Sequence, residues 1–218
     1  MYKIGAGKAE IKCFKPGVGM MGYGMPHHKA VEQESILYAR AFVVEHPETG
    51  TKFALVNTES AFVTMAMKQA VLDRLTAEYP QWGYNHANTL FCAQHTHSAP
   101  GGYSHYPIYN MSIPGFQPKV FNANVDAIFE SIVAAEGNKK DGEIRVGNGM
   151  FDENHEVAFN RSLPAYNQNP DVEKMLPTQT HLALERQMNL IRFDDADGKP
   201  MGKANFLACI LQAYPTTA

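Results

Sequence analysis

The sequence is poor in cysteine, in net charge and in long apolar runs. Its three cysteines, Cys13, Cys92 and Cys209, are scattered and form no CxxC pair, which argues against a disulfide framework and a cysteine-based zinc site. The net charge is only −3 and no basic run occurs, so nothing indicates nucleic-acid binding. No apolar stretch approaches the roughly 18 residues of a transmembrane helix, and no signal peptide is visible after Met1.

What is present is the composition of an ordinary globular protein, with 44% hydrophobic and 19% charged residues. We expect one α/β domain over residues 1–218. The patterns predict a hairpin of strands at 38–44 and 53–57, a helix at 61–78 capped by Ser60, and a strand at 89–93. A helix at 120–136, a short strand at 143–146 and a second hairpin at 188–193 and 204–211 follow, with the last strand central because it is apolar throughout. The predicted fold class is a mixed β-sheet with packed helices.

The predicted strand at 89–93 leads directly into His95-Thr96-His97, and Pro100-Gly101-Gly102 then forces the chain to turn. Histidines at i and i+2 on an extended backbone point to the same side, so both imidazoles would reach one point. Imidazole serves as a metal ligand and as a general base. The alternative is a pair of surface histidines at a strand end.

Two loops surround this stretch in the sequence. Residues 14–36 are dense in glycine and proline and by composition form a plain surface loop. The loop after the glycine turn carries Tyr103, Tyr106 and Tyr109. These rings would suit a substrate with an apolar body and a polar head, or would pack as loop core.

The string HTHSAPGG at residues 95–102 resembles the HTHSGPGG signature of the neutral/alkaline non-lysosomal ceramidases, zinc amidases that cleave the N-acyl bond of ceramide. Met20–Gly24, Ala39–Val43 and Asn160–Ser162 resemble three other family segments in the same order. The resemblance covers about residues 3–208. It implies zinc as cofactor, and a ceramide-like lipid amide as substrate. It assigns His95 as a zinc ligand, His97 and Arg161 to catalysis, and the Gly22 backbone to the substrate head group.

The sequence also departs from the family pattern. Residues 31–36 replace a frequent GIHxR string, so hydrolysis of another N-acyl or ester lipid is the alternative. Ile210 stands where the family has its second zinc histidine, and the chain ends before the glutamate and tyrosine ligands. The resemblance therefore implies the N-terminal portion of a catalytic domain. We expect it to be inactive alone and to self-associate through uncovered strand edges. A non-catalytic fragment or binding module is the other alternative. The family is often secreted or membrane-associated, so the compartment stays open.

Overall fold

The structure, a computed structural model, describes residues 1–25 and 27–207. Within this range the strands form one sheet in the order β4-β3-β2-β1-β5-β6-β7, in which β3 and β4 are parallel and all other neighbours are antiparallel. The bounds are β1 (Tyr2–Glu10), β2 (Tyr38–Glu45), β3 (Lys52–Thr58), β4 (Thr89–Ala93), β5 (Lys140–Met150), β6 (Gln187–Asp195) and β7 (Pro200–Phe206). The helices are α1 (Met65–Glu78), α2 (Pro118–Gly137) and α3 (Leu163–Tyr166), with short 3-10 turns η1 (Pro80–Trp82), η2 (Pro107–Asn110) and η3 (Pro177–Gln179). The predicted mixed α/β sheet is confirmed.

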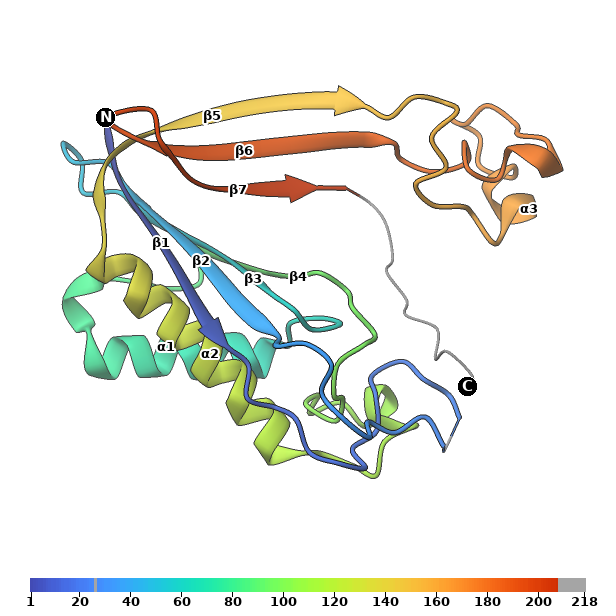
Figure 1. The fold of residues 1–218 in the computed structure, drawn as a ribbon, viewed down its shortest axis with the longest axis horizontal. Coiled ribbons are helices and arrows are strands. Elements are labelled where there is room, and N and C mark those ends of the chain that lie inside the picture. Colours follow the sequence, from blue (N-terminus) through green and yellow to red (C-terminus); the bar gives the residue numbers. More distant parts are fainter. Residues whose placement is uncertain (26, 208–218) are drawn as a thin grey trace.

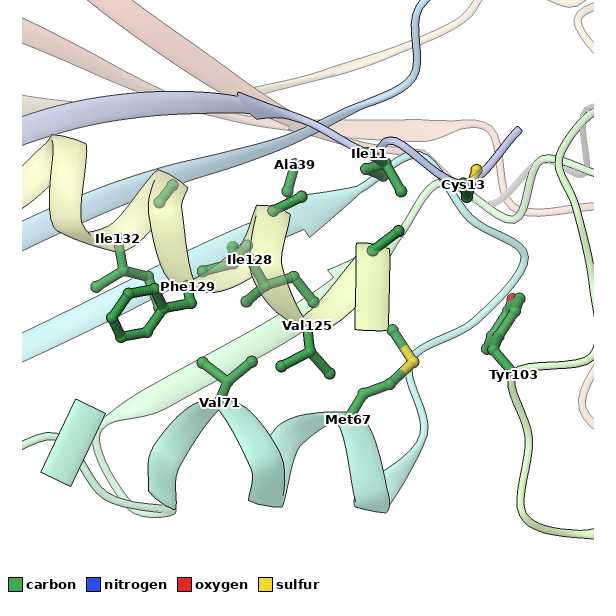
Figure 2. Packing of buried hydrophobic residues seen from close by; sticks show 14 of the residues in the cluster. Ile11, Cys13, Ala39, Met67, Val71, Tyr103, Val125, Ile128, Phe129 and Ile132 are labelled. Carbon is green, nitrogen blue, oxygen red and sulfur yellow. The ribbon is translucent and has the colours of Figure 1, made fainter. Parts of the chain in front are cut away.

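The two long helices lie on one side of β1–β4 and build the core there (Figure 1). Helix α2 can lie directly on β1 because Gly5 and Gly7 face it, and a Cβ at either position would overlap a carbonyl oxygen of the helix. Helix α1 packs on α2 in turn. Figure 2 shows Met67 and Val71 of α1 pointing toward Val125 of α2, and all three are buried.

Two predicted boundaries are wrong. Ser60 does not cap α1, because the helix begins at Met65 and the Oγ1 atom of Thr64 accepts a hydrogen bond from the N–H of Met67 at 3.1 Å. Residues 59–63 are therefore a loop. Strand β5 spans Lys140–Met150 instead of four residues; most of it is exposed, so its sequence lacks the apolar alternation that marks a half-buried strand.

Strand β7 begins at Pro200, four residues before its predicted start, and among the described residues it is an edge strand, so the prediction that it is central is wrong. The expected match of Ile210 to a zinc histidine lies outside the described residues. Strands β5, β6 and β7 form a long ribbon that leaves β1 after pairing along Lys140–Gly142. The ribbon turns over the helix-free face of the sheet, where the rings of Phe42 and Phe193 stack with centroids 4.2 Å apart (Figure 1).

Candidate functional site

The direction of three strands brings the site loops together. Strands β1, β3 and β4 run in the same direction. The loops that follow them therefore all begin at the same end of the sheet, where the strands have their carboxyl ends; these loops are residues 11–37, 59–64 and 94–117. Backbone hydrogen bonds join them there: the N–H of Met21 donates to the oxygen of Ala99 at 3.1 Å, and that of Gln94 to Thr58 at 3.1 Å. Sites at the carboxyl ends of parallel strands are the usual arrangement in α/β proteins.

His95 and His97 meet at this edge with a defined orientation. The Nδ1 atom of His95 lies 2.7 Å from the oxygen of Ala61, and the Nδ1 atom of His97 lies 2.8 Å from the oxygen of Met21. Their two Nε2 atoms are 3.2 Å apart, and the rings are nearly perpendicular at 86°. A carbonyl oxygen only accepts hydrogen bonds, so each Nδ1 carries the proton and, in the neutral rings, each Nε2 presents a lone pair. Two facing lone pairs require a proton or a metal cation between them.

The convergence of the rings is confirmed, but its predicted cause is wrong. Strand β4 ends at Ala93, so the histidines do not sit on an extended strand. His95 instead has φ 60, and it is the one non-glycine residue with positive φ in the described part of the chain. This left-handed conformation costs about 1–3 kcal/mol and persists only where surrounding contacts fix it. The contacts of the His95 ring with the Ala61 oxygen and the His97 ring supply such a constraint.

Gly22 touches the pair from the first loop. Its φ is 82, and a Cβ at this position would overlap the Nδ1 and Cε1 atoms of His97. The absence of a side chain thus lets the Met21 carbonyl reach the His97 ring. Contact of the Gly22 backbone with a substrate head group stays a prediction.

Arg161 is not brought to the histidines. It is exposed, and among the residues the structure describes it makes no hydrogen bond or ion pair. The segment between β5 and β6 that contains it lies at the far end of the ribbon, apart from the loop that follows β4 (Figure 1). Its catalytic role stays a prediction.

The aromatic loop divides into two parts. Tyr106 and Tyr109 are exposed at 60% and 55%, whereas Tyr103 is fully buried and belongs to the core. Burial raises the pKa of Tyr103 to about 12, although hydrogen bonds with the N–H groups of Phe62 and Ala61 and with Ser60 act in the opposite direction.

The sequence analysis did not find the backbone carbonyls of Ala61 and Met21 that hold the two histidine rings, because every residue type supplies a backbone oxygen.

The part of the chain that the structure describes holds no group of three or more His, Cys, Asp or Glu side chains placed to bind a metal ion. The histidine pair therefore supplies two nitrogens and no third ligand. None of the helices within the described ranges is both long and apolar enough to cross a membrane.

Comparison with known proteins gives consistent matches over nearly the whole chain. Residues 2–210 match the family model described as neutral/alkaline non-lysosomal ceramidase, N-terminal. Neutral ceramidase of Pseudomonas aeruginosa is 39% identical over 201 residues, covering 92% of this chain and 29% of that protein. Neutral ceramidase 1 of Arabidopsis thaliana is 33% identical over 207 residues, covering 95% of this chain and 26% of that protein.

The fold agrees as well. The crystal structure of the Pseudomonas aeruginosa neutral ceramidase superposes with a TM-score of 0.85 at 38% identity, over 94% of this chain and 31% of that one. The chain thus spans less than a third of the length of these relatives. The chain belongs to the neutral/alkaline non-lysosomal ceramidase family.

Proposed function

We propose that this chain supplies the histidine part of a zinc-dependent site that hydrolyses the amide bond of a ceramide-like lipid. The observation that carries the proposal is the 3.2 Å approach of the His95 and His97 Nε2 atoms, with both Nδ1 atoms engaged by carbonyl oxygens. The names of the relatives, all neutral ceramidases, give the substrate class.

The arrangement fits a zinc site in part. The Nε2 atom of His95 presents a lone pair of the kind that binds zinc, and the Nε2 atom of His97 lies 3.2 Å from it, beside the place that a metal on His95 would take. A ligating histidine usually donates its other ring N–H to an oxygen, as both Nδ1 atoms do here, and this hydrogen bond fixes the tautomer and the ring plane. A catalytic zinc usually has three protein ligands, so residues beyond the described pair must complete the site.

Each residue of the site then has a distinct role. His95 holds the metal through Nε2. His97 holds or accepts a proton at Nε2 beside it, in a plane fixed by Met21 and made accessible by Gly22. Arg161 offers fixed donors to a polar head group or a carboxylate product. Zinc, when bound, polarises the amide carbonyl and lowers the pKa of a water molecule.

A chimera tests the activity. The matching N-terminal part of the Pseudomonas aeruginosa enzyme is replaced by this chain, and release of fatty acid from ceramide is measured. We expect hydrolysis that a chelator removes and zinc restores, and its loss in a His95→Ala chimera. A folded chimera in which His95→Ala hydrolyses ceramide as well as its parent would contradict the proposal.

Zinc binding to the chain alone is the companion measurement. We expect weak binding by calorimetry, abolished in His95→Ala, and no hydrolysis of ceramide by the unsupplemented chain. Stoichiometric tight binding would show that this chain by itself supplies further ligands, against the expectation, and equal binding by His95→Ala would show that His95 is not a ligand.

A second substrate class is favoured by one observation. Residues 31–36 lack the family's frequent string, and Val31 and Ile36 are 81% and 47% exposed in the loop that carries Gly22. The chimera is therefore assayed with a panel of N-acyl and ester lipids. Faster cleavage of one of these than of ceramide would assign this alternative.

A further inference from the structure

One peptide group lies between His95 and a buried tyrosine. The carbonyl of Ala61 accepts from Nδ1 of His95 at 2.7 Å, and the N–H of Phe62 donates to the hydroxyl oxygen of Tyr103 at 3.2 Å. This carbonyl and this N–H belong to the same peptide bond. In a trans peptide they point in opposite directions, so the imidazole and the phenol hold the bond from its two sides.

In the middle of the loop that contains this peptide, the Tyr103 hydroxyl is the side-chain partner of the backbone N–H groups. The loop connects β3 to α1. Glu59 anchors its start, through its N–H on the oxygen of Tyr38 at 3.0 Å and through its carboxylate, which accepts from the N–H of Tyr38 at 2.7 Å and pairs with Arg40. Ser60 Oγ makes a long 3.4 Å contact to the oxygen of Phe62, and the hydroxyl of Tyr103 also takes hydrogen bonds from Ser60 and the N–H of Ala61. Tyr103, in contrast, is fully buried, and Figure 2 places its ring beside Cys13 at the end of the core. The phenol is thus a rigid support for a loop that has no secondary structure of its own.

We propose that Tyr103 is a positioning residue for His95, acting through the Ala61–Phe62 peptide. The hydroxyl oxygen fixes the peptide plane, and the fixed carbonyl selects the Nδ1–H tautomer and ring orientation of His95. Hydrogen bonds in a chain polarise one another, so a bond at the Phe62 N–H makes the Ala61 oxygen a stronger acceptor. The support also stabilises the left-handed backbone of His95 (φ 60), which local preference disfavours.

The inference draws on the proposed function only for the chemical role of His95, and its test needs neither zinc nor substrate. The full chain is labelled with isotope-enriched histidine, and proton–nitrogen NMR reports the tautomer and the exchange of each ring proton. We expect Nδ1–H for both histidines. In Tyr103→Phe the ring still fills its site but the acceptor oxygen is gone. We expect the His95 Nδ1 proton to exchange about tenfold faster, as fits the loss of one hydrogen bond.

Three comparisons separate positioning from a loss of stability. His97 is an internal control, because Met21 on a different loop holds it. Tyr84→Phe removes another buried hydroxyl, whose partner Glu136 lies outside the site. Tyr109→Phe alters a ring 5.2 Å from Phe62 whose hydroxyl takes no part in the relay. The His97 Nδ1 signal should be unchanged in Tyr103→Phe, and both Tyr84→Phe and Tyr109→Phe should leave the His95 signal unchanged. A Tyr103→Phe spectrum with His95 unaltered, or a Tyr84→Phe spectrum in which His95 changes equally, would overturn the proposal.

A measurement on the unaltered chain guards against a variant that fails to fold. If Tyr103 and His95 hold the same peptide, the amide proton of Phe62 and the ring proton of His95 become exposed in the same opening event. Their protection against exchange should then agree. Free exchange of the Phe62 amide beside a protected His95 proton would contradict the relay.

Discussion

At the scale of single residues, the position of the His97 ring depends on the absence of a side chain at Gly22. Gly22→Ala places a methyl group where the His97 ring lies, and it forces a left-handed backbone (φ 82) on a residue with a Cβ. We expect the variant to lose the His97 Nδ1 hydrogen bond to Met21, and its free energy of unfolding to be lower by about 1–3 kcal/mol. NMR of the labelled histidines and urea unfolding measure the two effects.

The same loop offers a matched control. Gly17 has φ 80, but nothing lies within 4 Å of a Cβ built on it. Gly17→Ala therefore carries the backbone strain without the overlap, and we expect it to lose stability while the His97 signal is retained. If both variants lost the His97 signal to the same extent, the left-handed backbone of Gly22, and not the space it leaves for the His97 ring, would be the requirement.

The sequence motif identified both histidines and Gly22 but not the way they act. Two histidines two positions apart suggest an extended strand, whereas His95 has the left-handed conformation. Local preference alone would place glycine in that conformation. The sequence does not reveal it for His95, because the hydrogen bond that offsets the strain comes from Ala61, 34 residues away. The buried role of Tyr103 was equally hidden, since an aromatic residue in a loop fits a pocket and a core alike.

At the scale of elements, a charged network joins the end of the sheet opposite the site. Glu136 at the end of α2 binds Lys52 of β3 at 3.1 Å and Lys139 at 2.7 Å, and it accepts a hydrogen bond from Tyr84. Burial alone would raise the pKa of Glu136, but hydrogen bonds from Lys139, Tyr84 and Lys52 outweigh it and lower the pKa. Hydrogen bonding to Lys139 is likewise the main cause of the lowered pKa of Glu45.

This network predicts a loss of stability in acid. A carboxyl group whose pKa is lower in the folded state stabilises the fold above its unfolded pKa of about 4.3, and this stability is lost as the pH falls through the folded value. We expect Glu136→Gln to lower the free energy of unfolding by about 3 kcal/mol at neutral pH, because two lysines lose their buried partner. Its decline below about pH 4.3 should be shallower than in the parent chain. Urea unfolding at a series of pH values checks both.

The control for this prediction lies on the same helix. Glu130 is exposed, and Glu130→Gln should change neither the stability at neutral pH nor the acid decline. A parent chain and Glu136→Gln variant with parallel pH profiles would show that the lowered pKa values do not contribute to folding.

The sequence predicted β2, β3, β4, α2 and β6 to within two residues at each end, but it indicated no strand at β1, which packs against α2. Strand β2 alternates between buried and partly exposed positions and α2 has a buried face at helical spacing, whereas β3 and β4 are short apolar runs, so their patterns predict them well. Strand β5 is exposed along most of its length and was predicted far too short. The beginning of α1 was misplaced because Ser60 and Thr64 are both capping residue types, and tertiary contacts of the loop decide between them.

At the scale of the whole molecule, none of the helices in the described residues covers the ribbon of β5–β7 (Figure 1). Val146 and Met150 are 78% and 63% exposed, and because they are four residues apart on one strand they share a face. Phe206 of the edge strand β7 is 39% exposed. Exposed apolar side chains beside an unpaired strand edge favour association with another chain.

We therefore expect this chain to self-associate in a concentration-dependent manner, measured by sedimentation velocity and light scattering. The double variant Val146→Lys/Met150→Lys should shift the population to monomer, because the charges would be desolvated in any contact between ribbons. A matched control is Val31→Lys/Met25→Lys, which changes the same two residue types at 81% and 54% exposure in an irregular loop, and it should leave the association unchanged. A parent chain that stays monomeric at every concentration would show that the ribbon is stable uncovered, and a loss of association in both variants would locate the effect in net charge instead of in the ribbon.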